Sequence, residues 1–126
     1  MEANNNLKIG VVDDDGDLSD AYSKAIVNLG YPSPSVFNDG TSIVKALIED
    51  HQSFDVIIMD YRIPEMNGIE AAKIIQRYKK DTKIILATAF ASVKQETEAA
   101  GLPFLLKPFS AKQLQDSLSK ETLSQG

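Results

Sequence analysis

Short apolar runs alternate along the chain with segments whose apolar residues recur at three- and four-residue steps. The runs are rich in Ile, Val and Leu, a composition typical of strands buried on both faces of a sheet. They lie at residues 7–12, 35–37, 54–60, 83–88 and 104–106. Five strands alternating with five helical segments predict an α/β domain, in which right-handed crossovers place helices on both faces of a parallel sheet.

The first three helical segments carry apolar faces and signals for their ends. Asp17 is the candidate N-cap of the first segment, and Gly30 lies where this segment is expected to end. Tyr22 and Tyr78 fall on apolar faces of the first and third segments and are predicted to lie in the core or at its rim. The other residues on the second and third faces are Ile43, Val44, Leu47, Ile48, Ile69, Ala72 and Ile75.

Two later helices are predicted from their first residues. Ser92 with Gln95, and Ser110 with Gln113, have the spacing of a capping box. The first of these helices is expected to end near Gly101. The inner face of the second is expected to contain Leu114 and Leu118.

The composition is that of an ordinary globular protein, with 43% apolar and 25% charged residues among 126. We expect a single domain over residues 1–126, with a core at about 7–120 and frayed polar ends. The chain has no cysteine and one histidine, His51. Disulfides, thiolate catalysis and thiolate zinc sites are therefore excluded, and a multi-histidine metal site or a serine–histidine–aspartate triad is disfavoured.

Charge and hydropathy narrow the cellular setting. No apolar run approaches the length of a membrane span, and residues 1–6 lack the apolar core of a signal peptide. We therefore expect a cytoplasmic protein without membrane contact. The formal net charge of -5 argues against nucleic-acid binding by this chain itself.

Polar residues follow directly after four of the five apolar runs. Asp13 and Asp14 follow the first run, Asp60 ends the third, Thr88 ends the fourth and Lys107 follows the fifth. The carboxyl ends of parallel strands meet at one edge of the sheet, where ligands bind in such folds. We therefore expect these five side chains to lie close together.

Clustered carboxylates need a cation, and oxygen ligands without His or Cys favour a hard one such as Mg²⁺. Lys107 adds a fixed positive charge, and Thr88 adds a hydroxyl donor. These groups are the parts needed to transfer a phosphoryl group onto a carboxylate, with an Asp as the nucleophile. The expected product is an aspartyl phosphate.

Four motifs stand in order along the chain, at residues 11–15 (VVDDD), 59–68 (MDYRIPEMNG), 87–89 (ATA) and 104–109 (FLLKPF). This ordered set resembles the receiver domains of two-component response regulators. Each motif alone is weak, but together in this order they are specific and cover nearly the whole chain. The resemblance implies a flavodoxin-like (βα)5 three-layer sandwich with a five-stranded parallel sheet of strand order 2-1-3-4-5.

The resemblance also implies roles for the residues of the acidic edge. Asp60 is expected to accept the phosphoryl group. Asp13 and Asp14 are expected to hold Mg²⁺ together with Asp60 and the backbone carbonyl of Arg62. Asp14 is expected to be the more direct ligand of the acidic pair.

Further roles concern phosphate contact and switching. Thr88 is expected to hydrogen-bond the phosphoryl group, and Lys107 to pair with Asp60 or its phosphate. The bond between Lys107 and Pro108 is expected to be cis. Phe104 occupies the position of the switch aromatic, although it lacks the hydroxyl of the Tyr often found there. Arg62 and Phe90 occupy positions that gate water access in the family, so a bulky pair there is expected to slow hydrolysis of the phosphate.

The resemblance implies partners as well. The phosphoryl donor is expected to be a sensor histidine kinase or a phosphotransfer protein. The surface of the fourth helix, fifth strand and fifth helix is expected to signal to a downstream protein, to an attached output domain or to a second copy, giving a homodimer on phosphorylation. The chain would be a signalling module that catalyses only its own phosphorylation and dephosphorylation.

Three other functions compete with this interpretation. A phosphatase of the haloacid-dehalogenase type needs a second Asp two residues after the nucleophile, where this chain has Arg62. A flavodoxin-like electron carrier needs a glycine- and hydroxyl-rich loop after the first strand, where this chain has three Asp residues. A receiver-like docking module that is never phosphorylated would not need the intact Asp60, Thr88 and Lys107 set.

Overall fold

The structure is a computed structural model that describes the backbone of residues 6–123 and the side chains of residues 6–119. The ends were expected to fray outside a core of about 7–120, and residues 1–5 and 124–126 of these ends lie outside the described residues. The last helix continues to residue 123.

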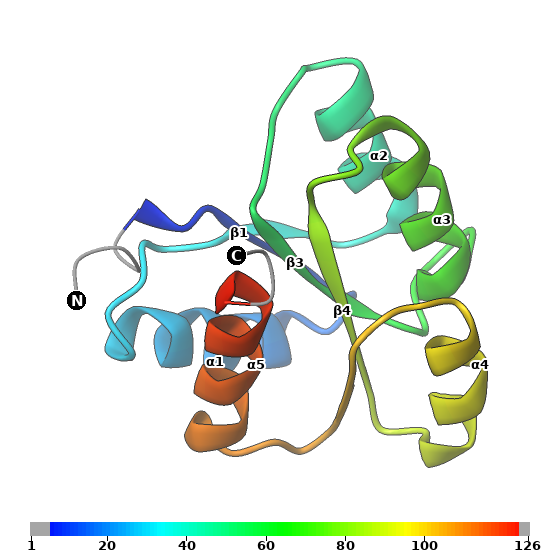
Figure 1. Ribbon diagram of the computed structural model, residues 1–126. Coiled ribbons are helices and arrows are strands. Elements are labelled where there is room, and N and C mark those ends of the chain that lie inside the picture. The colour runs from blue at the N-terminus through cyan, green and yellow to red at the C-terminus, as the bar shows by residue number, and fades with distance from the viewer. Residues whose placement is uncertain (1–5, 124–126) are drawn as a thin grey trace.

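Five parallel strands form one sheet in the order β2-β1-β3-β4-β5. The central strands β1, β3 and β4 lie side by side in Figure 1. The α/β class, the parallel sheet and the strand order 2-1-3-4-5 are confirmed. The strands are β1 (Ile9–Val12), β2 (Ser35–Phe37), β3 (Val56–Asp60), β4 (Lys83–Thr88) and β5 (Phe104–Leu106). The helices are α1 (Gly16–Asn28), α2 (Gly40–Ile48), α3 (Gly68–Tyr78), α4 (Lys94–Ala99) and α5 (Ala111–Leu123), with a short 3-10 helix, η2 (Ala91–Val93), before α4.

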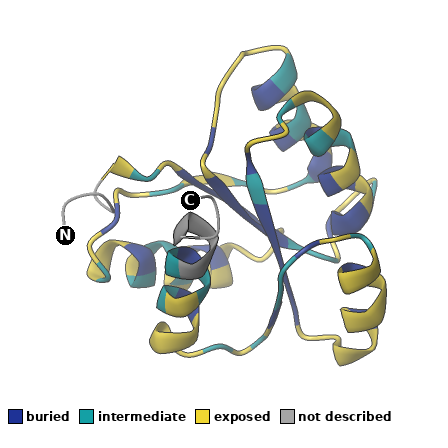
Figure 2. Cartoon of the chain, viewed as in Figure 1, coloured by how far each residue is buried: buried dark blue, intermediate teal, exposed yellow. Residues whose placement is uncertain are grey.

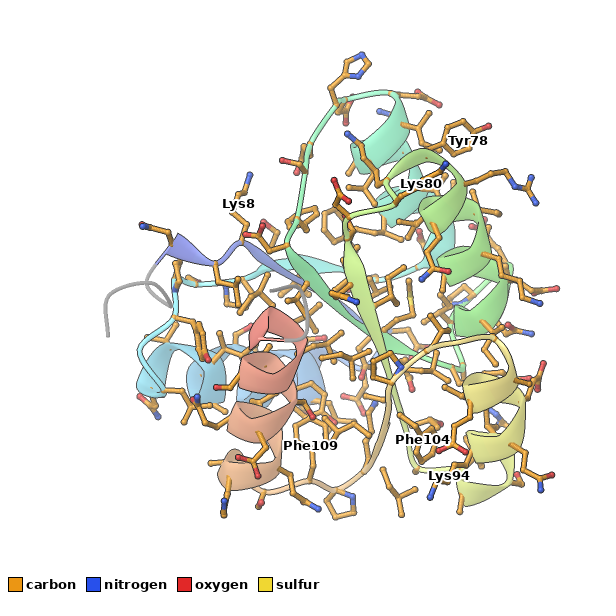
Figure 3. All side chains as sticks on the ribbon, in the orientation of Figure 1. Lys8, Tyr78, Lys80, Lys94, Phe104 and Phe109 are labelled. Carbon is orange, nitrogen blue, oxygen red and sulfur yellow. The ribbon has the colours of Figure 1, made fainter. Side chains whose placement is uncertain are left out.

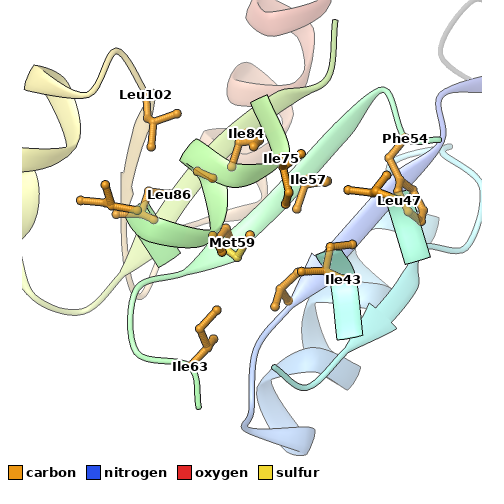
Figure 4. Packing of buried hydrophobic residues seen from close by; sticks show 14 of the residues in the cluster. Ile43, Leu47, Phe54, Ile57, Met59, Ile63, Ile75, Ile84, Leu86 and Leu102 are labelled. Atoms are coloured by element: carbon orange, nitrogen blue, oxygen red, sulfur yellow. The ribbon is translucent and has the colours of Figure 1, made fainter. Parts of the chain in front are cut away.

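Helices cover both faces of the sheet, with α1 and α5 on one face and α2, α3 and α4 on the other (Figure 1). Successive residues of a strand point to opposite faces. On β3, Ile57 and Met59 pack in the core under α2 and α3, while Val56 and Ile58 pack in the core under α1 and α5. Figure 2 shows the buried residues concentrated on the strands, and Figure 4 shows the packing of the first of these two cores.

Two helix ends agree with the sequence signals. Ser110 caps α5 as predicted, since its hydroxyl accepts a bond from the N–H of Gln113 at 3.0 Å and its own N–H donates to Gln113 at 2.8 Å. Gly30 and Gly101 follow α1 and α4 with φ of 101° and 79°, a region that glycine enters without steric cost. The predicted ends of both helices are therefore confirmed.

Two predicted helix starts are wrong. Asp15, rather than Asp17, caps α1: its carboxylate accepts bonds from the N–H groups of Asp17 at 3.0 Å and Leu18 at 3.2 Å, because the helix already begins at Gly16. Ser92 does not cap α4, because it lies inside η2 and neither helix has a side-chain cap.

Two further details of the helices differ from the sequence prediction. Tyr78 is the last residue of α3 and is 60% exposed, so it belongs to the surface. A capping box that the prediction missed starts α3, with Asn67 and Glu70 each accepting a bond from the other's N–H. The Asn-x-x-Glu spacing was its available signal.

Gly68 at the start of α3 fixes the position of the end of β3. A Cβ at this position would lie 2.2 Å from the carbonyl oxygen of Asp60 and 2.9 Å from a methyl group of Leu86. We expect Gly68→Ala to lower the free energy of unfolding by about 1–3 kcal/mol, the usual cost of overpacking, as measured by urea denaturation. Gly16→Ala is the matched control, because its Cβ would meet nothing within 4 Å. Equal effects of the two substitutions would contradict this explanation.

Candidate functional site

Four strands bring polar residues to the carboxyl edge of the sheet. Asp13 and Asp14 follow β1, Asp60 ends β3, Thr88 ends β4 and Lys107 follows β5. The Nζ of Lys107 lies 2.7 Å from Oδ2 of Asp13 and 3.3 Å from Oδ1 of Asp60. The structure therefore places these predicted residues at one edge and joins three of them by ion pairs.

The three carboxylates form one cluster. One oxygen from each of Asp13, Asp14 and Asp60 lies within 4.8 Å of the other two. Two like charges about 4 Å apart repel by about 4 kcal/mol at an effective dielectric near 20. Lys107 offers one positive charge against three negative ones, so the cluster keeps a net negative charge that a bound cation would neutralise.

Burial decreases across the cluster. Asp13 is 2% exposed, the side chain of Asp60 is 13% exposed, and Asp14 lies on the surface. The carboxylate of Asp60 is therefore held among protein groups and is still open to a reactant from solvent.

Carboxylate oxygens remain available in the cluster. Oδ1 of Asp13 accepts a hydrogen bond from the N–H of Asp15 at 2.9 Å, and Oδ1 of Asp60 accepts one from the N–H of Tyr61 at 2.9 Å. Among the described residues, Oδ2 of Asp60 and the carboxylate of Asp14 accept no hydrogen bond. A set of free carboxylate oxygens fits a hard cation such as Mg²⁺.

This environment shifts the pKa values of Asp60 and Lys107. Burial raises the pKa of Asp60; the nearby Lys107 acts in the opposite direction, and the charge of Asp13 adds to the rise. Burial acts to lower the pKa of Lys107, but the hydrogen bond to Asp13 and the charge of Asp60 outweigh it, so the pKa of Lys107 is raised. Lys107 is therefore a permanent cation at neutral pH.

Thr88 is fully buried at the edge of the site. Its Oγ1 accepts a bond from the N–H of Phe90 at 3.3 Å, which leaves the hydroxyl hydrogen available to another acceptor. Its carbonyl oxygen accepts a bond from the N–H of Lys107 at 2.9 Å, so the two residues are fixed side by side. The peptide bond between Lys107 and Pro108 is cis, as expected. Phe104, labelled in Figure 3, is half-buried on β5.

Arg62 and Phe90 make a bridge between the loops that follow β3 and β4. The guanidinium carbon of Arg62 lies 4.4 Å from the centroid of the Phe90 ring, and both side chains are on the surface. These loops flank Asp60 and Thr88. A surface hollow of about 390 Å³ opens next to the bridge and is lined by Asp14, Tyr61, Arg62, Ile63, Pro64 and Asn67.

One residue at the site was not predicted. Tyr22, expected only to pack at the core or its rim, lies beside Lys107 and stacks on Phe109. Its place on an apolar helical face gave no signal of this contact, since its partners come from the other end of the chain.

Residues 9–119 match the family model of the response regulator receiver domain. The chain belongs to this family. The match spans the whole set of strand-end residues, from Asp13 to Lys107. The fold of this receiver domain agrees with the flavodoxin-like arrangement that the resemblance implied.

Similar proteins differ in length. The receiver domain is 32% identical to regulatory protein AtoC of Escherichia coli K12 over 110 residues, which cover 85% of this chain and 23% of AtoC. It is 31% identical to chemotaxis protein CheY-3 of Vibrio cholerae over 127 residues, covering 95% of this chain and 96% of CheY-3. The chain therefore spans less than a quarter of one relative and nearly all of the other.

A solved structure shows the same fold with a metal. The receiver domain of sensor histidine kinase PA1611 from Pseudomonas aeruginosa PAO1 has a magnesium ion coordinated in its active-site cleft. It is 27% identical to this receiver domain, with a TM-score of 0.80 and coverage of 90% of this chain and 95% of that one.

Receiver domains are the phosphorylation-dependent switches of two-component systems, and they interact with histidine kinases or phosphotransfer proteins. They are signalling modules rather than enzymes in the usual sense, and they bind Mg²⁺ at an acidic pocket. The predicted family is therefore confirmed, and the phosphatase and electron-carrier alternatives are disfavoured. In the described part of the chain, no helix has both the length and the apolar character needed to cross a membrane.

Proposed function

We propose that Asp60 accepts a phosphoryl group from the phosphohistidine of a sensor histidine kinase or a phosphotransfer protein, in a Mg²⁺-dependent reaction. The observation that most supports this is the ammonium of Lys107, 3.3 Å from the carboxylate of Asp60 and 2.7 Å from that of Asp13. A buried cation beside a solvent-accessible carboxylate suits phosphoryl transfer onto that carboxylate, because the cation offsets the negative charge of the phosphoryl oxygens.

Asp13, Asp14, Asp60 and the backbone carbonyl of Arg62 would hold the Mg²⁺ ion. When bound, the ion supplies positive charge that offsets the charge of the phosphoryl oxygens and of the carboxylates. The cluster of three carboxylates, with free oxygens on Asp14 and Asp60, supports this assignment.

The transfer itself needs a nucleophile and neighbouring donors. A free carboxylate oxygen of Asp60 attacks phosphorus, the P–N bond of the donor breaks, and its electron pair stays on the imidazole nitrogen. Lys107 then pairs with the new phosphate, and the hydroxyl of Thr88 donates a hydrogen bond to it. Both groups start from positions next to the acceptor, so little reorganisation is needed.

The signal is proposed to leave through the surface of α4, β5 and α5. When Thr88 moves toward the phosphate, it vacates space near β5, and the half-buried ring of Phe104 turns inward. Because Phe104 has no hydroxyl, packing alone transmits the change. Leu106, 45% exposed on β5, belongs to the surface that a downstream protein, an attached output domain or a second copy would contact.

The organisation of the chain is part of the proposal. Residues from about 7 to 120 form one receiver domain, a proposal supported by the family match over residues 9–119. This domain catalyses only its own phosphorylation and dephosphorylation. The cytoplasmic location expected from the sequence stays a prediction.

Intact mass spectrometry after incubation with phosphoramidate tests the proposed function. With Mg²⁺ present, we expect a mass increase of one phosphoryl group, and with EDTA we expect none. A chain that folds and stays unmodified under both conditions would instead be a docking module.

The bridge between Arg62 and Phe90 is expected to lengthen the life of the aspartyl phosphate, because a closed bridge hinders the approach of water. An exposed cation–π contact contributes roughly 0.5–1 kcal/mol, so Arg62→Ala should speed dephosphorylation about two- to fivefold. Loss of ³²P label from protein separated from its donor measures this rate. Arg77→Ala, which changes the exposed arginine in the last turn of α3, is the control and should leave the rate unchanged. Slower loss from Arg62→Ala would show that the bridge does not exclude water.

A further inference from the structure

An aromatic pair packs against the lysine of the site. The Nζ of Lys107 lies 5.4 Å from the centroid of the Tyr22 ring, within the roughly 6 Å over which cation–π attraction acts. The Tyr22 ring in turn stacks on Phe109, with centroids 4.9 Å apart and ring planes inclined by 24°. Figure 3 labels Phe109, near the start of α5.

The three residues come from two segments of the chain that contact each other. Phe109 comes two positions after Lys107, so the segment that carries the lysine also carries the ring that supports Tyr22. Tyr22 comes from α1, the helix that follows Asp13 and Asp14 in the chain. The contact therefore joins helix α1 to the loop after β5.

A lysine in this position needs to be held. Its four-carbon stem is flexible, and an ammonium free to choose other rotamers would spend less time beside its partner carboxylates. The backbone of Lys107 is fixed by the bond from its N–H to Thr88, and its side chain is only 9% exposed. The carboxylates of Asp13 and Asp60 attract the ammonium, and the Tyr22 ring also packs against it.

We infer that Tyr22 is a positioning residue for the reaction: its ring, supported by Phe109, holds the Lys107 ammonium beside Asp13 and Asp60. The inference rests on the proposed function, in which Lys107 pairs with the phosphoryl group on Asp60. Tyr22 acts only through Lys107. The positioning is assigned to the ring face, whose centroid lies 5.4 Å from Nζ, although Lys107 also interacts electrostatically with the Tyr22 hydroxyl.

Nuclear magnetic resonance tests the contact without any phosphodonor. In protein labelled with ¹³C-lysine, the ε-methylene protons of Lys107, assigned with Lys107→Met, should be shifted upfield by the Tyr22 ring current, relative to an exposed lysine such as Lys112. Lys8, which lies over the Phe54 ring, is left out of this comparison. Tyr22→Phe keeps the ring and should keep the shift, whereas Tyr22→Leu should lose it. An unshifted Lys107 signal in the wild-type chain would overturn the inference.

Phosphorylation rates test whether the contact between Tyr22 and Lys107 matters for the reaction. With phosphoramidate and Mg²⁺, Tyr22→Leu should lower the rate constant roughly three- to tenfold, and Tyr22→Phe should stay within about twofold of wild type. Tyr78→Leu removes an exposed tyrosine elsewhere and is the control. A wild-type rate for Tyr22→Leu would overturn the inference, as would a Tyr22→Phe variant as slow as Tyr22→Leu.

A second variant covers the case in which Tyr22→Leu does not fold. Phe109→Leu leaves the Tyr22 ring in place and removes its stacking partner. A reduced ring-current shift together with a reduced rate supports the inference, and an unchanged shift and rate overturn it. If the wild-type chain takes up no phosphate at all, the proposed function fails, while the resonance of Lys107 still decides whether the contact exists.

Discussion

Asp60→Asn is expected to reduce phosphate uptake to background, a loss of at least roughly 10³-fold in rate. The amide of Asn is uncharged and a poor nucleophile, so no acyl phosphate forms at this position. The fold should survive, because burial and the charge of Asp13 already raise the pKa of Asp60, and removing its charge relieves that repulsion. Incorporation of ³²P from phosphoramidate measures the loss, and circular dichroism with urea denaturation checks the fold.

Asp20→Asn is the matched control for this substitution. Asp20 is an exposed carboxylate on α1, away from the cluster of three carboxylates, and its replacement should leave phosphate uptake at the wild-type rate. Uptake by Asp60→Asn at the rate of the control would mean that another residue is the acceptor.

Lys107→Met is expected to lower the free energy of unfolding by about 3 kcal/mol at neutral pH in metal-free buffer. The side chains of Lys107, Asp13 and Asp60 are 9%, 3% and 13% exposed, so removal of the ammonium leaves two largely buried carboxylates without their cation. Urea denaturation gives the difference. Phosphorylation should fall as well, because the cation that would pair with the phosphate is lost.

Lys112→Met is the control for the loss of a lysine ion pair. Lys112 pairs with Asp116 one turn away, and these side chains are 82% and 57% exposed. Water screens such a pair, so its loss should change the free energy of unfolding by less than about 0.5 kcal/mol. Equal losses for Lys107→Met and Lys112→Met would show that the buried position of Lys107 has no special energetic role.

The loss of unfolding free energy caused by Lys107→Met should depend on pH. Burial raises the pKa of Asp60 even in the presence of Lys107, and loss of the ammonium removes a contribution that lowers it. A carboxyl whose pKa is raised on folding costs stability where it is ionised, and this cost disappears as the pH falls through the raised pKa toward the ordinary value. The difference in unfolding free energy between Lys107→Met and wild type should therefore be largest near neutral pH and should decrease in acid. Added Mg²⁺ should also narrow it, by supplying positive charge to the same carboxylates.

The residues at the acidic edge could be predicted because they follow from topology. Once five strands are parallel, the residue after each strand must lie at the same edge, whatever the loops do. Asp13, Asp60 and Lys107 could therefore be placed together from the sequence. Their detailed pairing could not: Lys107 was expected to pair with Asp60 or its phosphate. It does pair with Asp60, at 3.3 Å, but the closer ion pair with Asp13, at 2.7 Å, was not predicted.

The details that the sequence did not predict depend on exact backbone geometry or on distant contacts. Asp15 and Asp17 are both good caps, and only the start of the helix at Gly16 decides between them. Ser92 has the right spacing, but the 3-10 turn around it removes the extended backbone that a cap requires. The Tyr22–Phe109 stack joins helix α1 to the loop before α5, which is far away in the sequence, and no local pattern marks such a pair.

The phosphorylation switch and the role of Lys107 both depend on phosphate being attached to the carboxylate of Asp60 rather than to another side chain. The most direct measurement is borohydride reduction of the phosphorylated protein, which converts an aspartyl phosphate to homoserine, followed by peptide mass spectrometry. We expect homoserine at position 60 alone, and only when Mg²⁺ was present during phosphorylation. Homoserine at another aspartate, or a phosphorylated chain with position 60 unchanged, would contradict the assignment of the site.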